Sequence, residues 1–138
     1  MATLSVPASI EHLATVNAFI AEHMPEQHRG IIPQVELTAE ELLVNVFSYA
    51  YPDSPGKAEV GCRVVLFDDA PFFCLTVRDW GAPFNPFSEA PTPDTSLDVE
   101  ERPVGGLGVH LIKSMVGHYS YSHHEASNHI ELYFPLGD

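Results

Sequence analysis

The chain of 138 residues has few basic side chains, and this scarcity limits its partners. Six lysines and arginines stand against nineteen aspartates and glutamates, which gives a formal net charge of −13. Such a surface repels nucleic acid and anionic membrane, because phosphate groups are bound mainly by lysine and arginine. We therefore expect no direct nucleic-acid or membrane partner, and a basic or apolar protein surface fits this charge better.

Cysteines and long apolar runs are also scarce. No run approaches the roughly 18 apolar residues of a membrane span, and the start of the chain, Met1 to Pro7, lacks the pattern of a signal peptide. The two cysteines, Cys62 and Cys74, fit a reducing compartment, and alternation in their strands places them on opposite faces of a sheet. We therefore expect a cytoplasmic protein without a disulfide.

What is present fits one globular domain spanning residues 1–138. Apolar residues make up 45% of the chain and charged residues 18%, an ordinary balance for a folded core. Residues 2–6 suit an edge strand, and two helices are predicted over 9–24 and about 33–50. The helical spacing of the first is carried by Ile10, Leu13, Val16, Ile20 and Met24.

Beyond these helices the apolar period changes from 3.6 to 2. Strands are predicted over 58–67 and 72–79, joined by a turn at 68–71, and over 118–124 and 128–134, with a helix over 107–116. Residues 82–104 carry five prolines, which predicts a long loop, and such loops are often functional lids. The order predicts an α+β, two-layer α/β sandwich whose mostly antiparallel mixed sheet packs on helices.

The second predicted helix carries Glu41 and Asn45, which are four residues apart and share one face. An amide oxygen can bind Mg²⁺, and a neighbouring carboxylate can act as a general base. An alternative is purely structural, because Thr38 and Glu41 have the spacing of a capping box at a helix start.

Asp79 ends an apolar strand and is followed by Trp80 and Gly81. A carboxylate there can accept a hydrogen bond from an exocyclic amine such as that of adenine, and the glycine allows close approach of a flat ligand. An ordinary Asp-x-Gly turn is the competing interpretation.

A glycine cluster, Gly105, Gly106 and Gly108, precedes the predicted helix 107–116. Backbone N–H groups at a helix start can meet phosphate, and the helix dipole favours the anion. The cluster is neither a dinucleotide fingerprint nor a P-loop, because it follows a proline-rich loop and lacks the Gly-Lys-Ser/Thr ending. A lid hinge is the alternative, and the two roles are compatible.

Four histidines, His118, His123, His124 and His129, gather near the end of the chain. Strand alternation puts His123 and His124 on opposite faces, and no cysteine is near. Solvated strand histidines therefore explain the cluster better than a metal site.

Taken together and in this order, these segments resemble the ATPase superfamily of gyrase, heat-shock protein 90, histidine kinases and mismatch-repair ATPases (GHKL). Residues 41–45 look like its N box, 79–86 like its first glycine box and 105–113 like its second. Within the superfamily the chain is most similar to the anti-sigma-factor serine-protein kinases. The resemblance covers nearly the whole chain and implies the GHKL fold, with an ATP lid at about 82–106.

The resemblance also implies Mg²⁺ and ATP as cofactors and assigns roles to matching residues. Asn45 would hold Mg²⁺, Glu41 would be the general base, and Asp79 would bind the adenine amine. The remaining residues that the resemblance places at the nucleotide are Gly81, Phe84, Arg102, Gly105, Gly106, Leu107 and Gly108.

The sequence departs from the family pattern at three places. Tyr49 stands where the N box often has a histidine, and Asn85 stands where aspartate is frequent. Arg102 is the only basic residue of the predicted lid. Positive charge near the phosphates is therefore sparse, although phosphoryl transfer depends on positioning and charge stabilisation.

The resemblance implies a serine-protein kinase and anti-sigma factor. It would phosphorylate a serine of a STAS-type anti-anti-sigma protein and bind a sigma factor, with a homodimer possible. One alternative is a non-catalytic module that binds its partner in a nucleotide-dependent way. A detached histidine-kinase ATPase domain is another, less favoured because the sequence shows no phospho-acceptor helices.

Overall fold

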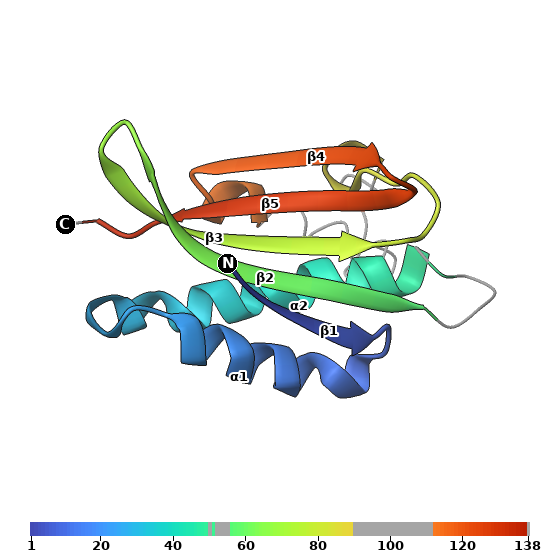
Figure 1. Cartoon of the computed structure of the whole chain (residues 1–138), viewed down its shortest axis with the longest axis horizontal. Coiled ribbons are helices and arrows are strands. Elements are labelled where there is room, and N and C mark those ends of the chain that lie inside the picture. Colours follow the sequence, from blue (N-terminus) through green and yellow to red (C-terminus); the bar gives the residue numbers. More distant parts are fainter. Residues whose placement is uncertain (50, 52–55, 90–111, 138) are drawn as a thin grey trace, which may run out of the picture.

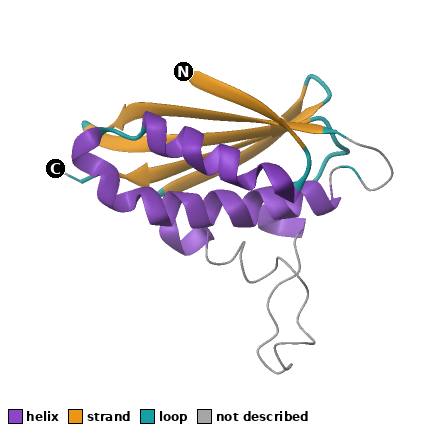
Figure 2. Ribbon diagram, turned by 90° about the horizontal axis from the view of Figure 1, so that it is seen from below, coloured by secondary structure: helices purple, strands orange, loops and turns teal. Residues whose placement is uncertain are grey.

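The protein folds as a two-layer α+β sandwich, as the sequence predicts. The computed structural model describes residues 1–49, 51, 56–89 and 112–137. A five-stranded sheet forms one layer, and the two long helices cover one of its faces (Figures 1 and 2). Strand order is β1-β2-β3-β5-β4, and every neighbouring pair among the described strands is antiparallel, so the sheet is not mixed.

The observed elements follow the predicted order closely. None of the helices in the described ranges is long and apolar enough to cross a membrane. The elements are β1 (Ala2–Pro7), η1 (Ile10–His12), α1 (Leu13–His23), η2 (Glu26–Ile31), α2 (Ile32–Tyr49), β2 (Lys57–Phe67), β3 (Ala70–Asp79), α3 (Pro86–Glu89), β4 (His118–His124) and β5 (Ser127–Pro135).

The helix layer buries the apolar stripes that the periodicity predicts, with one exception. Val16 and Ile20 of α1 are fully buried, as are Val35 and Leu42 of α2. Ile10 is 66% exposed, because it lies in the short 3₁₀ turn η1 before α1, where the period of an α-helix does not apply.

The sheet separates the two cysteines as predicted. Cys62 pairs with Leu75 on the face that the helices cover, whereas Cys74 pairs with Arg63 on the other face. Both thiols are free and buried. Burial, followed by the proximity of Cys74, raises the pKa of Cys62 to about 12. Burial also raises the pKa of Cys74.

The segment after β3 contains a helical turn where the sequence predicts only loop. The Asn85 side chain accepts a hydrogen bond from Phe87 N at 2.9 Å, and Pro86 follows as the first residue of α3. An asparagine cap and a proline at the first helical position are both favourable at a helix start. Residues 90–106 of the predicted lid lie outside the described residues, and of the predicted helix 107–116 only its end, 112–115, is described as helical.

Two hairpins close with two-residue turns that contain no glycine. Asp68 and Asp69 have φ of 50° and 66°, and Glu125 and Ala126 have φ of 54° and 59°. Two consecutive positive φ values are typical of the type I′ turn, which matches the twist of the flanking strands. The first turn is shorter than the predicted 68–71, because β3 already begins at Ala70.

The strained turn at Ala126 gives a prediction about stability. We expect Ala126→Gly to raise the free energy of unfolding by about 0.5–1 kcal/mol, because glycine adopts this backbone without steric cost. Ala18, an exposed residue within α1, is the matched control, since Ala18→Gly should lower stability by about 1 kcal/mol. Urea denaturation measures both. Equal losses in the two variants would mean that the turn is not strained.

Candidate functional site

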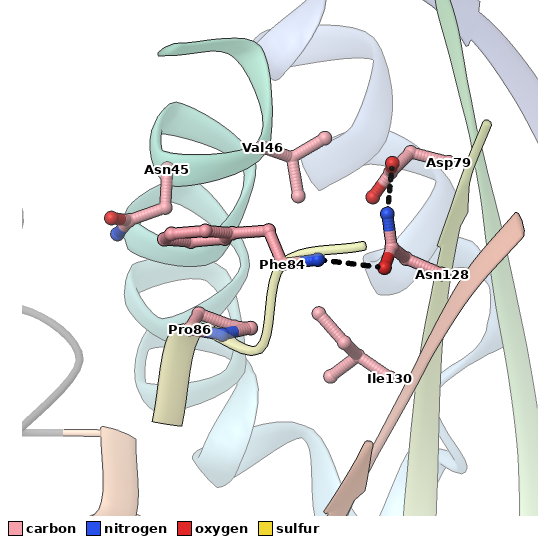
Figure 3. A pocket seen from close by; sticks show the side chains of 7 residues that line it. All are labelled: Asn45, Val46, Asp79, Phe84, Pro86, Asn128 and Ile130. Atoms are coloured by element: carbon pink, nitrogen blue, oxygen red, sulfur yellow. Dashed lines mark hydrogen bonds between the residues drawn. The ribbon is translucent and has the colours of Figure 1, made fainter. Parts of the chain in front are cut away.

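Three of the residues predicted for the site come together between α2 and the end of β3. Asn45 of α2, Asp79 of β3 and Phe84 line one small cavity of about 10 Å³, roughly the room of a single water (Figure 3). The other residues around it are Val46, Pro86, Asn128 and Ile130. The structure therefore brings the helix and the strand end together around one cavity.

Asp79 is a buried carboxylate held by neutral donors. It is 3% exposed, and its Oδ1 accepts hydrogen bonds from Asn128 Nδ2 and from Gly81 N, both at 2.9 Å. No basic side chain forms an ion pair with it in the described part of the chain. Because a carboxylate can accept about four hydrogen bonds, Asp79 retains capacity to bind a donor from a ligand.

Asn128 is the hub of the site, and the sequence analysis missed it. It pairs with Asp79 in the register of β3 and β5 and is 1% exposed. Its Nδ2 also donates to Ala82 O at 3.0 Å, and its Oδ1 accepts from Phe84 N at 3.1 Å and from the Tyr121 hydroxyl. One amide therefore fixes both the carboxylate and the chain that follows it.

A signal for Asn128 was available in the strand pattern. Its side chain lies on the same face of β5 as Ile130, Leu132 and Phe134, all of which are buried. A polar residue on a core face needs partners, because an unpaired buried amide is costly. The position of Asn128 on this face therefore indicates a buried polar partner on a neighbouring strand, and that partner is Asp79 at the end of β3.

Asn45 presents an oxygen without a partner. It is 1% exposed and its Nδ2 donates to Glu41 O at 2.9 Å, while its Oδ1 is buried and has no hydrogen-bond partner among the described residues. An unsatisfied buried acceptor costs about 1–3 kcal/mol. A hard cation such as Mg²⁺ prefers oxygen ligands, so this atom fits the metal role predicted for Asn45.

Glu41 lies one turn before Asn45 and is partly exposed. Its proposed alternative as part of a capping box is wrong, because α2 begins at Ile32 and Thr38 lies inside the helix. The Thr38 hydroxyl donates to Gln34 O at 2.8 Å instead. Glu41 does not line the cavity, so its role as a general base stays a prediction.

The chain after β3, residues 81–87, is called the strap below. Phe84 belongs to this strap and closes one side of the cavity. Its half-buried ring lies beside Asn45, while its N–H is bound by Asn128 (Figure 3). Small-molecule sites usually measure roughly 300–1,000 Å³, far more than this cavity. A purine can therefore enter only if the Phe84 ring and the strap shift.

The predicted contacts on the lid stay predictions. The residues predicted to make these contacts lie outside the described ranges, so their distances to Asp79 and Asn45 stay predictions too. These residues are Arg102, Gly105, Gly106, Leu107 and Gly108.

The four histidines are divided between the two ends of the sheet. The rings of His124 and His129 stack at 4.0 Å on the face of the sheet opposite the helices, whereas His118 packs against Phe67 and Phe72 at the other end of the sheet. The described ranges contain no group of three side chains suited to a metal ion. Burial, together with His124 and Arg78, lowers the pKa of His129.

The donor role of Asn128 can be tested with an isosteric change. We expect Asn128→Asp to cost about 2–4 kcal/mol at pH 8, because two carboxylates then face each other without a donor. The loss should shrink at pH 5, since one proton shared by the two adjacent carboxyl groups supplies the missing donor. Urea denaturation at both pH values measures this dependence.

Gln27→Glu is the matched control, because it makes the same amide-to-carboxylate change at an exposed residue of η2. It should change stability by less than about 0.5 kcal/mol. If Asn128→Asp were as mild as this control, Asn128 would not be the hub of the site.

The comparisons with known proteins concern the fold and the family of the chain. Among solved structures, the chain is similar to the Acinetobacter baumannii histidine kinase AdeS, with 11% identity and a TM-score of 0.51 over 100% of this chain and 70% of that one. The blue-light activated histidine kinase of Erythrobacter litoralis EL346 gives 16% identity and a TM-score of 0.54 over 91% and 41%. Its histidine kinase domain gives 16% and 0.49 over 95% and 62%.

These identities are low, so the two structures with TM-scores above 0.5 support the fold alone. The chain spans less than two thirds of either Erythrobacter structure. No curated protein is similar enough to count as a match. The family model of the histidine kinase-like ATPase domain, however, matches residues 6–134. This match covers nearly the whole chain, and the chain therefore belongs to the histidine kinase-like ATPase domain family.

Proposed function

We propose that the chain binds Mg-ATP between α2 and the end of β3 and transfers its γ-phosphate to a serine of a protein partner. The observation that carries the proposal is the buried Asp79 carboxylate beside a cavity, where the donors among the described residues are all neutral. A purine with an exocyclic amine supplies the missing donor. A purine with a carbonyl at that position would oppose one acceptor with another, so the site should favour adenine.

The metal end of the proposed site rests on Asn45. Its buried oxygen, which has no partner in the described part of the chain, would coordinate Mg²⁺, and the cation would neutralise phosphate charge in a protein of net charge −13. Glu41 lies on the same helix, one turn away and partly exposed to solvent. It would accept the proton of the attacking hydroxyl.

The partner and setting are proposed from the sequence resemblance. They are a STAS-type anti-anti-sigma protein as phosphate acceptor, a sigma factor as second partner, a cytoplasmic location and a possible homodimer. A detached histidine-kinase ATPase domain and a non-catalytic, nucleotide-dependent binding module are the alternatives. The second alternative shares the nucleotide site but does not need Glu41, so this residue separates it from the kinase.

Mg-ATP binding is the first expectation to test. Titration calorimetry should show saturable binding to the wild-type chain and at least about a tenfold weaker affinity for Asp79→Asn, because the variant replaces a charged acceptor with an amide. Asp69→Asn in the β2–β3 turn makes the same chemical change away from the cavity and should leave the affinity unchanged. A folded wild-type chain that does not bind Mg-ATP would contradict the proposal.

The role of Glu41 gives a second expectation. Glu41→Gln should retain Mg-ATP affinity and lose roughly 10²- to 10⁴-fold in the rate of phosphoryl transfer, the usual contribution of a general base. Transfer of labelled phosphate to a STAS-type partner measures the rate, with Glu36→Gln on the same helix as the control. Unchanged transfer by Glu41→Gln would remove its catalytic role.

A further inference from the structure

A tyrosine hydroxyl lies between two strands at the point where Asp79 ends β3. Tyr51 OH donates to Lys57 O at 2.7 Å and accepts from Trp80 N at 2.7 Å. The last register pair of β2 and β3 is Ala58 with Asp79, so Lys57 and Trp80 come next along the ladder. The hydroxyl thus bridges the Lys57 carbonyl and the Trp80 N–H, the backbone groups that follow the last register pair of the ladder.

The alternation of the antiparallel ladder shows what the hydroxyl replaces. Phe67 and Ala70 flank the two-residue turn and form a hydrogen-bonded pair, and every second pair from there is of the same kind. Lys57 and Trp80 fall in this series, so Trp80 N–H would otherwise bond directly to Lys57 O. Tyr51 is inserted into that bond, which holds the strands apart and ends the sheet at Asp79.

We propose that Tyr51 is a positioning residue that sets the location of the Asp79 carboxylate relative to α2. This inference rests on the proposed adenine site. Tyr51 follows the end of α2, the helix that carries Asn45, and its hydroxyl binds the peptide N–H immediately after Asp79. One side chain therefore links the metal end of the site to its purine end.

The neighbouring glycine supports a fixed place for the Tyr51 ring. A Cβ added to Gly56 would lie 2.3 Å from two atoms of that ring, a distance that requires one of them to move. The Gly56 carbonyl also accepts from Ala8 N at 2.9 Å, which anchors this backbone to the end of β1. Gly56 therefore keeps open the space in which the ring lies.

Removal of the hydroxyl has a defined consequence. Without it, Trp80 N–H and Lys57 O are free to bond directly, which draws the end of β3 toward β2 and moves Asp79 and Gly81 with it. Displacements of about 1 Å at a binding group are enough to weaken an oriented interaction strongly. The effect should be greatest for contacts to the purine and absent from contacts to the phosphates.

The test is base selectivity of the full chain, measured as Mg-ATP and Mg-GTP affinities by calorimetry. We expect Tyr51→Phe to weaken Mg-ATP binding by about tenfold and to leave Mg-GTP binding nearly unchanged, so that the preference for ATP falls. Gly56→Ala, which displaces the ring without removing the hydroxyl, should reduce the preference in the same way. Trp80, the only tryptophan, should report the shift as changed fluorescence in Tyr51→Phe.

Tyr133→Phe is the matched control. Its hydroxyl donates to Glu131 Oε2, also at 2.7 Å, on the sheet face away from the helices, so both affinities should stay at wild-type values. Equal weakening of Mg-ATP and Mg-GTP in Tyr51→Phe would show a general structural role and overturn the inference, as would unchanged affinities. Failure of the wild-type chain to bind Mg-ATP would instead overturn the proposed function.

Discussion

The site depends on one contact, the hydrogen bond from Asn128 to Asp79 across β3 and β5. It is formed on the helix-covered face of the sheet, where a carboxylate without donors would be too costly to bury. The same amide binds Ala82 and Phe84, so the direction of the chain after β3 is set by the group that stabilises the carboxylate. A neutral partner, unlike a basic one, leaves the negative charge available to a ligand.

Around this contact the molecule brings together groups from distant parts of the chain. Asn45 comes from α2 and carries an acceptor that no described residue satisfies, while Tyr51 connects the same helix to the backbone after Asp79. Phe84 lines the same cavity as Asn45 and Asp79, and its ring lies beside Asn45 (Figure 3). The candidate site is therefore assembled around a cavity with room for about one water.

The sequence predicts the layers, the strand order along the chain and the meeting of Asn45 with Asp79, because period and motif spacing are local properties. It does not predict Asn128 or Tyr51 as parts of the site. The partners of Asn128 are set by the register of β5 against β3, and those of Tyr51 by the place where the β2–β3 ladder ends. The capping box at Thr38 fails because α2 begins at Ile32, directly after the 3₁₀ turn η2, so Thr38 lies inside the helix. Likewise, Ile10 fits a helical stripe by spacing and is exposed because the helix begins after it.

The most direct test of the central claim is an NMR titration of the labelled chain with Mg²⁺ and a non-hydrolysable ATP analogue. Two sets of signals should shift together and saturate if the nucleotide binds at this site. They are the side-chain amide signals of Asn128 and Asn45 and the backbone signals of Gly81 and Phe84. Signals from the opposite face of the sheet, such as Glu131, should stay in place. Saturable shifts confined to that opposite face, with Asn128 unperturbed, would contradict the account.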